Sequence, residues 1–175
     1  MAYTAPTTRI TGELITASIW NTDITDNLDA LKDPPSDNYE ADEGSDYTTS
    51  STSFTDVDGA GTELTLTITT TGGDVLIGFT GVCRIAGAPC TGYFDVYHVE
   101  DAANIGGDDG LIGFNSTAAN TEIPVSFVHL LTGVSAGSHT FRLVWKRATN
   151  NLTLFAGAGT GTADWHPQFW VREAS

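Results

Sequence analysis

Hydrophobic residues recur at every second position from about Ser53 onward, and this alternation constrains the fold more than any other feature. The clearest runs are 64–68, 75–85, 93–99, 125–131 and 141–145, with shorter ones at 152–154 and 169–171. Because successive side chains of a strand point to opposite faces of a sheet, each run predicts a strand with one buried face. No helical stretch separates the runs, so parallel β-α-β units are excluded and antiparallel sheets are expected.

Turn signals separate these runs at short intervals. They are Asp58-Gly59, Gly72-Gly73, Gly106-Gly107, Ala136-Gly137 and Asn150-Asn151. With shorter pieces at 53–57 and 111–114, we expect about nine strands. Short strands joined by glycine turns indicate a β-sandwich, and a jelly roll is the favoured form. The chain is therefore expected to be all-β over residues 51–175, as an antiparallel β-sandwich, preceded by a short helix and an acidic linker.

One helix is expected near the N-terminus, from Thr16 to Leu31. Thr16 is a suitable N-cap, because its hydroxyl can accept a hydrogen bond from a free backbone N–H of the first turn. Asp33-Pro34-Pro35 ends the helix, since proline cannot continue it. Residues 1–31 are thus interpreted as an N-terminal arm and helix.

This helix has a hydrophobic face with no obvious core of its own to cover. Trp20, Ile24, Leu28 and Leu31 recur at spacings of four, four and three, which places them on one side. A short isolated helix is marginal in water, so this face needs a partner. The partner is either the same helix of other subunits or a site on another protein; alternatively, the helix folds back onto the β-domain. The anchoring or oligomerisation residues are taken as Ile19, Trp20, Ile24, Leu28 and Leu31.

Residues 32–50 (KDPPSDNYEADEGSDYTTS) carry six acids against Lys32 and are interpreted as a solvated acidic linker. The EF-hand spacing is absent from this segment. Two acidic turns further on, at 56–59 and 100–110, could supply oxygen ligands for calcium, although solvated loop acids are the favoured interpretation.

The net charge is −15, which disfavours nucleic acid and anionic membrane surfaces as partners. No hydrophobic run reaches the length of a membrane span, so no membrane insertion is expected.

The first residues lack a basic region followed by an apolar one, so no secretory signal is expected and the chain would be assembled in the cytoplasm. In that compartment Cys83 and Cys90 are expected to be reduced, partly buried thiols, with a small disulfide as the alternative.

No catalytic motif is found, so the chain is not expected to be an enzyme. The alternating glycines of 157–162 are not followed by a helix and are interpreted as a loop. The four histidines fall at scattered positions of the predicted strands: His98, His129, His139 and His166. Metal coordination between strands is conceivable, but hydrogen-bonded strand histidines are favoured, and no metal or cofactor is expected.

Aromatic residues gather near the C-terminus, where Trp165 and Trp170 have opposite parity. In a regular strand they would point to opposite faces, so one of them is expected to be exposed or to lie in a subunit interface. An exposed tryptophan could also stack on a sugar.

The segment from Ile10 to Leu31 (ITGELITASIWNTDITDNLDAL) resembles one found near the start of many tailed-bacteriophage structural proteins, approximately G-x-x-I/V-T-A-x-x-W/L-N-x-D-I/V-x-D-N-L. The run from Gly137 to Glu173 resembles the closing strands of phage jelly-roll modules, which are similar in kind to the trimeric tumour-necrosis-factor and C1q heads. Neither match contains a catalytic motif.

The resemblance implies a non-enzymatic virion component with its β-domain on the particle surface, as a homotrimer. The helix would contact other virion proteins, and the length suits a capsid decoration or head-fibre protein, or a tail appendage, better than a tail fibre with a long shaft. The alternative is a module that binds a host receptor or surface glycan.

A charge on the hydrophobic face of the helix tests its role. Ile24→Asp should abolish oligomerisation or attachment to the particle, because a carboxylate in the contact would lose its hydration. The β-domain should stay folded by circular dichroism. Light scattering and the amount bound to particles are the measurements, and unchanged attachment at unchanged stoichiometry would contradict the anchoring role.

Overall fold

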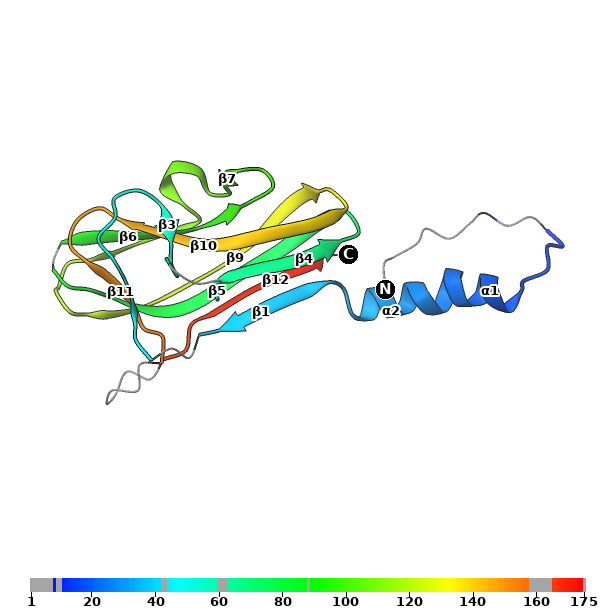
Figure 1. The fold of residues 1–175 in the computed structure, drawn as a ribbon, viewed down its shortest axis with the longest axis horizontal. Coiled ribbons are helices and arrows are strands. Elements are labelled where there is room, and N and C mark those ends of the chain that lie inside the picture. The colour runs from blue at the N-terminus through cyan, green and yellow to red at the C-terminus, as the bar shows by residue number, and fades with distance from the viewer. Residues whose placement is uncertain are drawn as a thin grey trace.

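In the computed structural model, two antiparallel sheets pack against each other and a helix extends from one end of them (Figure 1). The structure describes residues 8, 11–41, 44–59, 63–87, 89–157 and 165–174.

Sheet A is built around one long strand, β5 (Gly73–Ile85). Along one edge β5 pairs with β9 (Glu122–Val134). Along the other edge it pairs first with β12 (Gln168–Ala174) and then with β11 (Leu152–Leu154). Two outer strands complete the sheet: β1 (Ser36–Glu40) pairs with β12, and β2 (Tyr47–Thr49) pairs with β11.

Sheet B is built around β10 (Gly137–Arg147) and β6 (Cys90–His98), which pair with each other. The other edge of β10 carries β4 (Thr65–Thr70) and β3 (Thr55–Asp56). The other edge of β6 carries β8 (Ile112–Ser116) and the two-residue β7 (Ala103–Asn104). A short 3₁₀ helix, η2 (Gly107–Asp109), lies between β7 and β8.

The order of pairing is that of a jelly roll. Early strands pair with late ones in a nested series: β1 with β12, β4 with β10, β5 with β9, and β6 with β8. Such a series is what folding one long hairpin over on itself produces, and it distributes the strands over two sheets. The predicted all-β antiparallel jelly roll behind a short N-terminal helix is confirmed.

The interpretation of residues 32–50 as a solvated linker needs correction, because β1 and β2 lie within it and both join sheet A. Tyr39 of β1 packs against the core, and the backbone N–H of Ala41 donates to Pro167 at 2.9 Å. β1 was not predicted because this edge strand has polar residues on its solvent side and a single large hydrophobic residue, so it shows no hydrophobic alternation.

The helix runs from Ala17 to Lys32, close to the predicted bounds. It comprises α1 (Ala17–Trp20), a π-helical stretch η1 (Asn21–Asp26) and α2 (Asn27–Lys32). The predicted cap is confirmed, since the Thr16 hydroxyl accepts from the Ile19 N–H at 3.3 Å. The wider π turn was not expected; π segments are rare and are often found at functional positions. Figure 1 shows the helix projecting away from the sandwich rather than folding back onto it.

A chain of aromatic rings joins the two sheets in the core. Phe94 of β6 is fully buried and stacks on Phe79 of β5, with ring centroids 5.0 Å apart. It also contacts Trp145 of β10 at 5.8 Å and Phe114 of β8 at 6.2 Å. Phe94 therefore links the two sheets across the sandwich.

Removing the Phe94 ring should be among the most destabilising single changes in the core. We expect Phe94→Ala to lower the free energy of unfolding by about 3–5 kcal/mol, since it loses both buried surface and ring packing. Urea unfolding measures this loss. Val99→Ala, at an exposed position in the turn after β6, is the control and should change stability by less than about 0.5 kcal/mol. A loss for Phe94→Ala as small as the control's would contradict the central position of this ring.

Candidate functional site

The outer face of sheet A, turned away from sheet B, carries a hydrophobic patch. The strand register aligns Trp170 of β12, Gly78 of β5 and Val128 of β9 in one row. The next row places Leu76 beside Leu130. Val128 is 67% exposed and Leu130 is 47% exposed. We call these five residues the sheet A patch.

Trp170 lies across the sheet because Gly78 leaves room for it. A Cβ at position 78 would stand 2.2 Å from ring atoms of Trp170, so no other residue fits without moving the indole. The ring is half-buried against the sheet and presents its other side outward. Trp170 thus adds a flat aromatic surface beside the two exposed aliphatic side chains.

Strand β9 forms one side of this patch, and one of its two backbone edges is not paired with another strand in the described part of the chain. Within the described residues it pairs with β5 alone, over most of its 13 residues. A long edge strand with exposed hydrophobic side chains is a site where further chains associate. Val128 and Leu130 were not among the predicted site residues, because the alternation through Val125 and Phe127 was taken as the only hydrophobic face of this strand. The signal was that β9 is hydrophobic on both faces.

The predicted anchoring residues form a second hydrophobic surface, on the helix. We call Trp20, Ile24, Leu28 and Leu31 the hydrophobic ridge of the helix. Within the described part of the chain this ridge faces solvent, with Trp20 at 54% and Leu28 at 59% exposure. Ile24 and Leu31 are also exposed, and Ile19 is half-buried.

Trp165 lies apart from Trp170, in the segment before β12. Its ring meets Phe155 edge-on, with centroids 5.1 Å apart, and the Arg84 guanidinium stands over the other ring at 5.2 Å. The prediction that Trp165 and Trp170 point to opposite faces required both to lie in one strand. Trp165 precedes the strand, and both side chains are half-buried.

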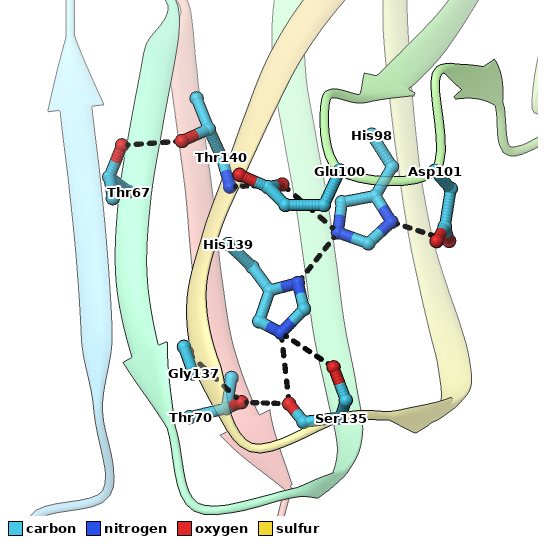
Figure 2. Close-up of polar contacts among 9 residues, drawn as sticks. All are labelled: Thr67, Thr70, His98, Glu100, Asp101, Ser135, Gly137, His139 and Thr140. Atoms are coloured by element: carbon cyan, nitrogen blue, oxygen red, sulfur yellow. Dashed lines mark hydrogen bonds and ion pairs between the residues drawn. The ribbon is translucent and has the colours of Figure 1, made fainter.

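A polar cluster lies where β6 ends and β10 begins (Figure 2). His98 and His139 are 3% and 5% exposed, and His98 Nε2 stands 3.0 Å from His139 Nδ1. His98 also stands 3.4 Å from the Glu100 carboxylate and 2.7 Å from that of Asp101. His139 Nε2 contacts the Ser135 backbone oxygen at 2.9 Å. We call this set the histidine cluster.

Among the other acids and thiols considered from the sequence, Asp108 and Asp109 are exposed, and the following have protein partners or are buried. Asp56 pairs with Arg142 at 2.7 Å, and Asp58 accepts from the Glu63 N–H at 3.2 Å. Cys83 and Cys90 are free buried thiols on strands of different sheets. Burial raises the pKa of the Cys83 thiol, which disfavours its reactive thiolate form.

One carboxyl group is fully buried inside sheet B. Asp95 Oδ1 accepts from the N–H groups of Val96 at 2.7 Å and Gly106 at 2.8 Å, which ties the β7 turn to β6. Its Oδ2 has no hydrogen-bond partner among the described residues. Loss of hydration raises the pKa of Asp95, and the two backbone donors together with nearby His129 and Lys146 oppose this rise.

These features define the class of protein: an all-β jelly-roll sandwich behind a short N-terminal helix, with hydrophobic surfaces on both parts. No helix in the described part of the chain is long and hydrophobic enough to cross a membrane.

No protein-family model matches this chain, and no curated protein matches it. Among solved structures, Eiger TNF from S. frugiperda is similar at 9% identity, over 80% of this chain and 92% of that one, with a TM-score of 0.47. Dimeric latent PorU from Porphyromonas gingivalis is similar at 9% identity, over 79% of this chain and 12% of that one, with a TM-score of 0.39. The jelly-roll assignment rests on the strand order of this chain itself.

The buried carboxyl group should make stability depend on pH. The folded-state pKa of Asp95 lies above its unfolded value, so the folded chain holds this proton more tightly. Stability therefore falls as pH rises from the unfolded pKa through the folded one. In urea unfolding between about pH 4 and 7, the stability of the natural chain relative to Asp95→Asn should decrease with rising pH, because asparagine keeps an oxygen acceptor and carries no charge. A relative stability that is constant or rises with pH would contradict this assignment.

Proposed function

We propose that this chain is a non-enzymatic structural component of a phage virion. It associates with copies of itself, as a homotrimer, through the outer face of sheet A. Its N-terminal helix attaches it to other virion proteins, so that the jelly roll is displayed on the particle surface as a capsid decoration, head fibre or tail appendage. The observation that carries the proposal is the pair of exposed hydrophobic surfaces on a chain whose net charge is −15.

The sheet A patch has the composition of a protein interface. Its centre is formed by hydrophobic side chains, including one tryptophan, a residue type enriched at interface centres. Its border is polar: Arg172 lies beside Leu76 in the strand register, and Gln168 lies beside Thr80. A hydrophobic centre with a polar border supports contact with another folded surface.

A second copy of the chain is the occupant that this patch favours. Arg172 is one of only seven basic residues, against 22 acidic ones, so the chain is strongly acidic on average. An approach between such copies is least opposed where charge is sparse, as it is over Trp170, Gly78 and Val128. Three-fold symmetry is taken from the resemblance to phage jelly-roll heads.

The helix supports attachment because it projects from the sandwich (Figure 1) and its hydrophobic side chains are exposed. Helices this short gain most of their stability from packing on a partner. The ridge residues Trp20, Ile24, Leu28 and Leu31 therefore suit a groove on another virion protein. The resemblance of Ile10–Leu31 to phage structural proteins points to the same role.

The solution mass of the full chain tests self-association. We expect a trimer by light scattering, and a chain beginning at Pro34, which keeps β1, should remain a trimer. A chain beginning at Tyr47 would lack β1, which pairs with β12 in sheet A, so it would not test the interface of an intact sheet. Val128→Asp should dissociate the trimer into folded monomers, because it places a carboxylate in the centre of the contact.

Thr69→Asp is the matched control, since Thr69 is exposed on a strand of sheet B. It should leave the mass unchanged. A monomeric natural chain, or a trimer that survives Val128→Asp, would contradict the sheet A interface. Mass spectrometry of virions purified on a density gradient tests the location: the chain should be present in many copies per particle, and its recovery only among unassembled proteins would contradict the virion role.

A further inference from the structure

The histidine cluster brings three electron-pair donors to one point. One ligand atom from each of His98, Glu100 and His139 lies within 4.8 Å of the other two. The two imidazole nitrogens are 3.0 Å apart, and His98 Nε2 is 3.4 Å from Glu100 Oε2. Both rings are buried, and the carboxylate reaches in from the surface.

The hydrogen bonds on the far side of each ring fix where the protons are. The Ser135 backbone oxygen can only accept, so His139 Nε2 carries a proton and donates it at 2.9 Å. The Asp101 carboxylate accepts in the same way from His98 Nδ1 at 2.7 Å. In the neutral rings, the two nitrogens that face each other, His98 Nε2 and His139 Nδ1, are then both unprotonated.

The lone pairs of these two nitrogens, whose atoms are 3.0 Å apart, repel each other, and the Glu100 carboxylate beside them adds to the repulsion. A cation between them turns this repulsion into attraction. A single shared proton would satisfy only the two nitrogens and would leave one net negative charge on the cluster with Glu100 and Asp101. A divalent metal ion would satisfy all three donors and neutralise both carboxylates.

We propose that the histidine cluster is a binding site for a divalent transition-metal ion of the zinc type, held by His98 Nε2, His139 Nδ1 and Glu100. Imidazole nitrogen and carboxylate oxygen are both common zinc ligands. Around a tetrahedral zinc ion, ligand atoms about 2.0–2.1 Å from the metal stand about 3.3 Å apart. The two spacings from His98 Nε2, 3.0 Å to His139 and 3.4 Å to Glu100, are close to this value, and the spacing between His139 and Glu100 is within 4.8 Å. Water completes the fourth position.

The surrounding residues already hold the ligands in place. Metal-binding histidines usually donate their second N–H to a carboxylate or a backbone oxygen, and Asp101 and Ser135 provide one of each. Phe141 stacks on the His98 ring, with centroids 4.8 Å apart and planes within 8°. The Thr140 N–H donates to Glu100 Oε2 at 2.8 Å.

The site joins parts of the chain that lie far apart in sequence. His98 ends β6, Glu100 follows it, and His139 is near the start of β10, next to the turn that holds Ser135 (Figure 2). A bound ion would therefore tie the end of β6 and the residues after it to the start of β10. Its role is to stabilise the sandwich, independently of the proposed virion function.

Zinc titration of the full chain tests the site. After dialysis against a chelator, isothermal titration calorimetry should give one zinc ion per chain. Zinc should also raise the midpoint of thermal unfolding by about 5–10 °C at about 100 times Kd. Absence of binding by a folded natural chain would overturn the proposal and leave a shared proton as the cation between the rings.

Variants separate this site from non-specific binding. Glu100→Gln keeps an oxygen that can accept from the Thr140 N–H but loses the charge, and it should weaken zinc binding by about tenfold or more. His139→Gln should abolish the binding, with near-ultraviolet circular dichroism reporting whether the chain is folded. His129→Gln changes a strand histidine outside the cluster and should bind as the natural chain does. Zinc binding that is unchanged in both cluster variants would overturn the proposal.

Discussion

The pairing of β5 along both of its edges is the interaction on which the rest of the molecule depends. β5 holds β9 on one side, and β12 and β11 on the other, so sheet A does not exist without it. Its alternation also gives the sheet two different faces, one packed in the core and one turned outward. Val75, Ile77 and Phe79 point into the core, and Leu76 and Gly78 lie on the outer face, between Trp170 and the exposed residues of β9.

The fold was predictable because most strands bury one face and show it as alternation. β4, β5, β6, β9, β10 and β12 all match predicted runs. The strands that were missed, β1, β2 and β7, are short, polar and at sheet edges. Only single side chains of β1 and β2, Tyr39 and Tyr47, pack against the core, so these strands show no hydrophobic alternation. The helix cap at Thr16 was read correctly, because capping is local chemistry. The π-helical turn has no comparable local signal.

The site residues were less accessible to sequence reasoning, because they depend on strand neighbours. His98 and His139 are 41 positions apart and meet only because β6 pairs with β10 in one particular register. Metal binding between strands could be considered from the sequence, but the sequence does not show that His98 and His139 are the two histidines that meet. The outer face of sheet A is a different case. Its residues belong to strands that were predicted, but a strand that is hydrophobic on both faces was assigned only its buried face.

The junction between the helix and the sandwich has a mechanical consequence. The helix ends at Lys32, and β1 begins four residues later, at Ser36, already paired with β12. The Glu173 N–H donates to the Pro35 oxygen at 2.8 Å, so the pairing starts at the junction itself. A pull on the helix would therefore run along β1 and load its hydrogen bonds to β12 in shear, all at once. A β-domain loaded through such a junction resists the separation of β1 from β12 far better than one whose strands are peeled apart one bond at a time.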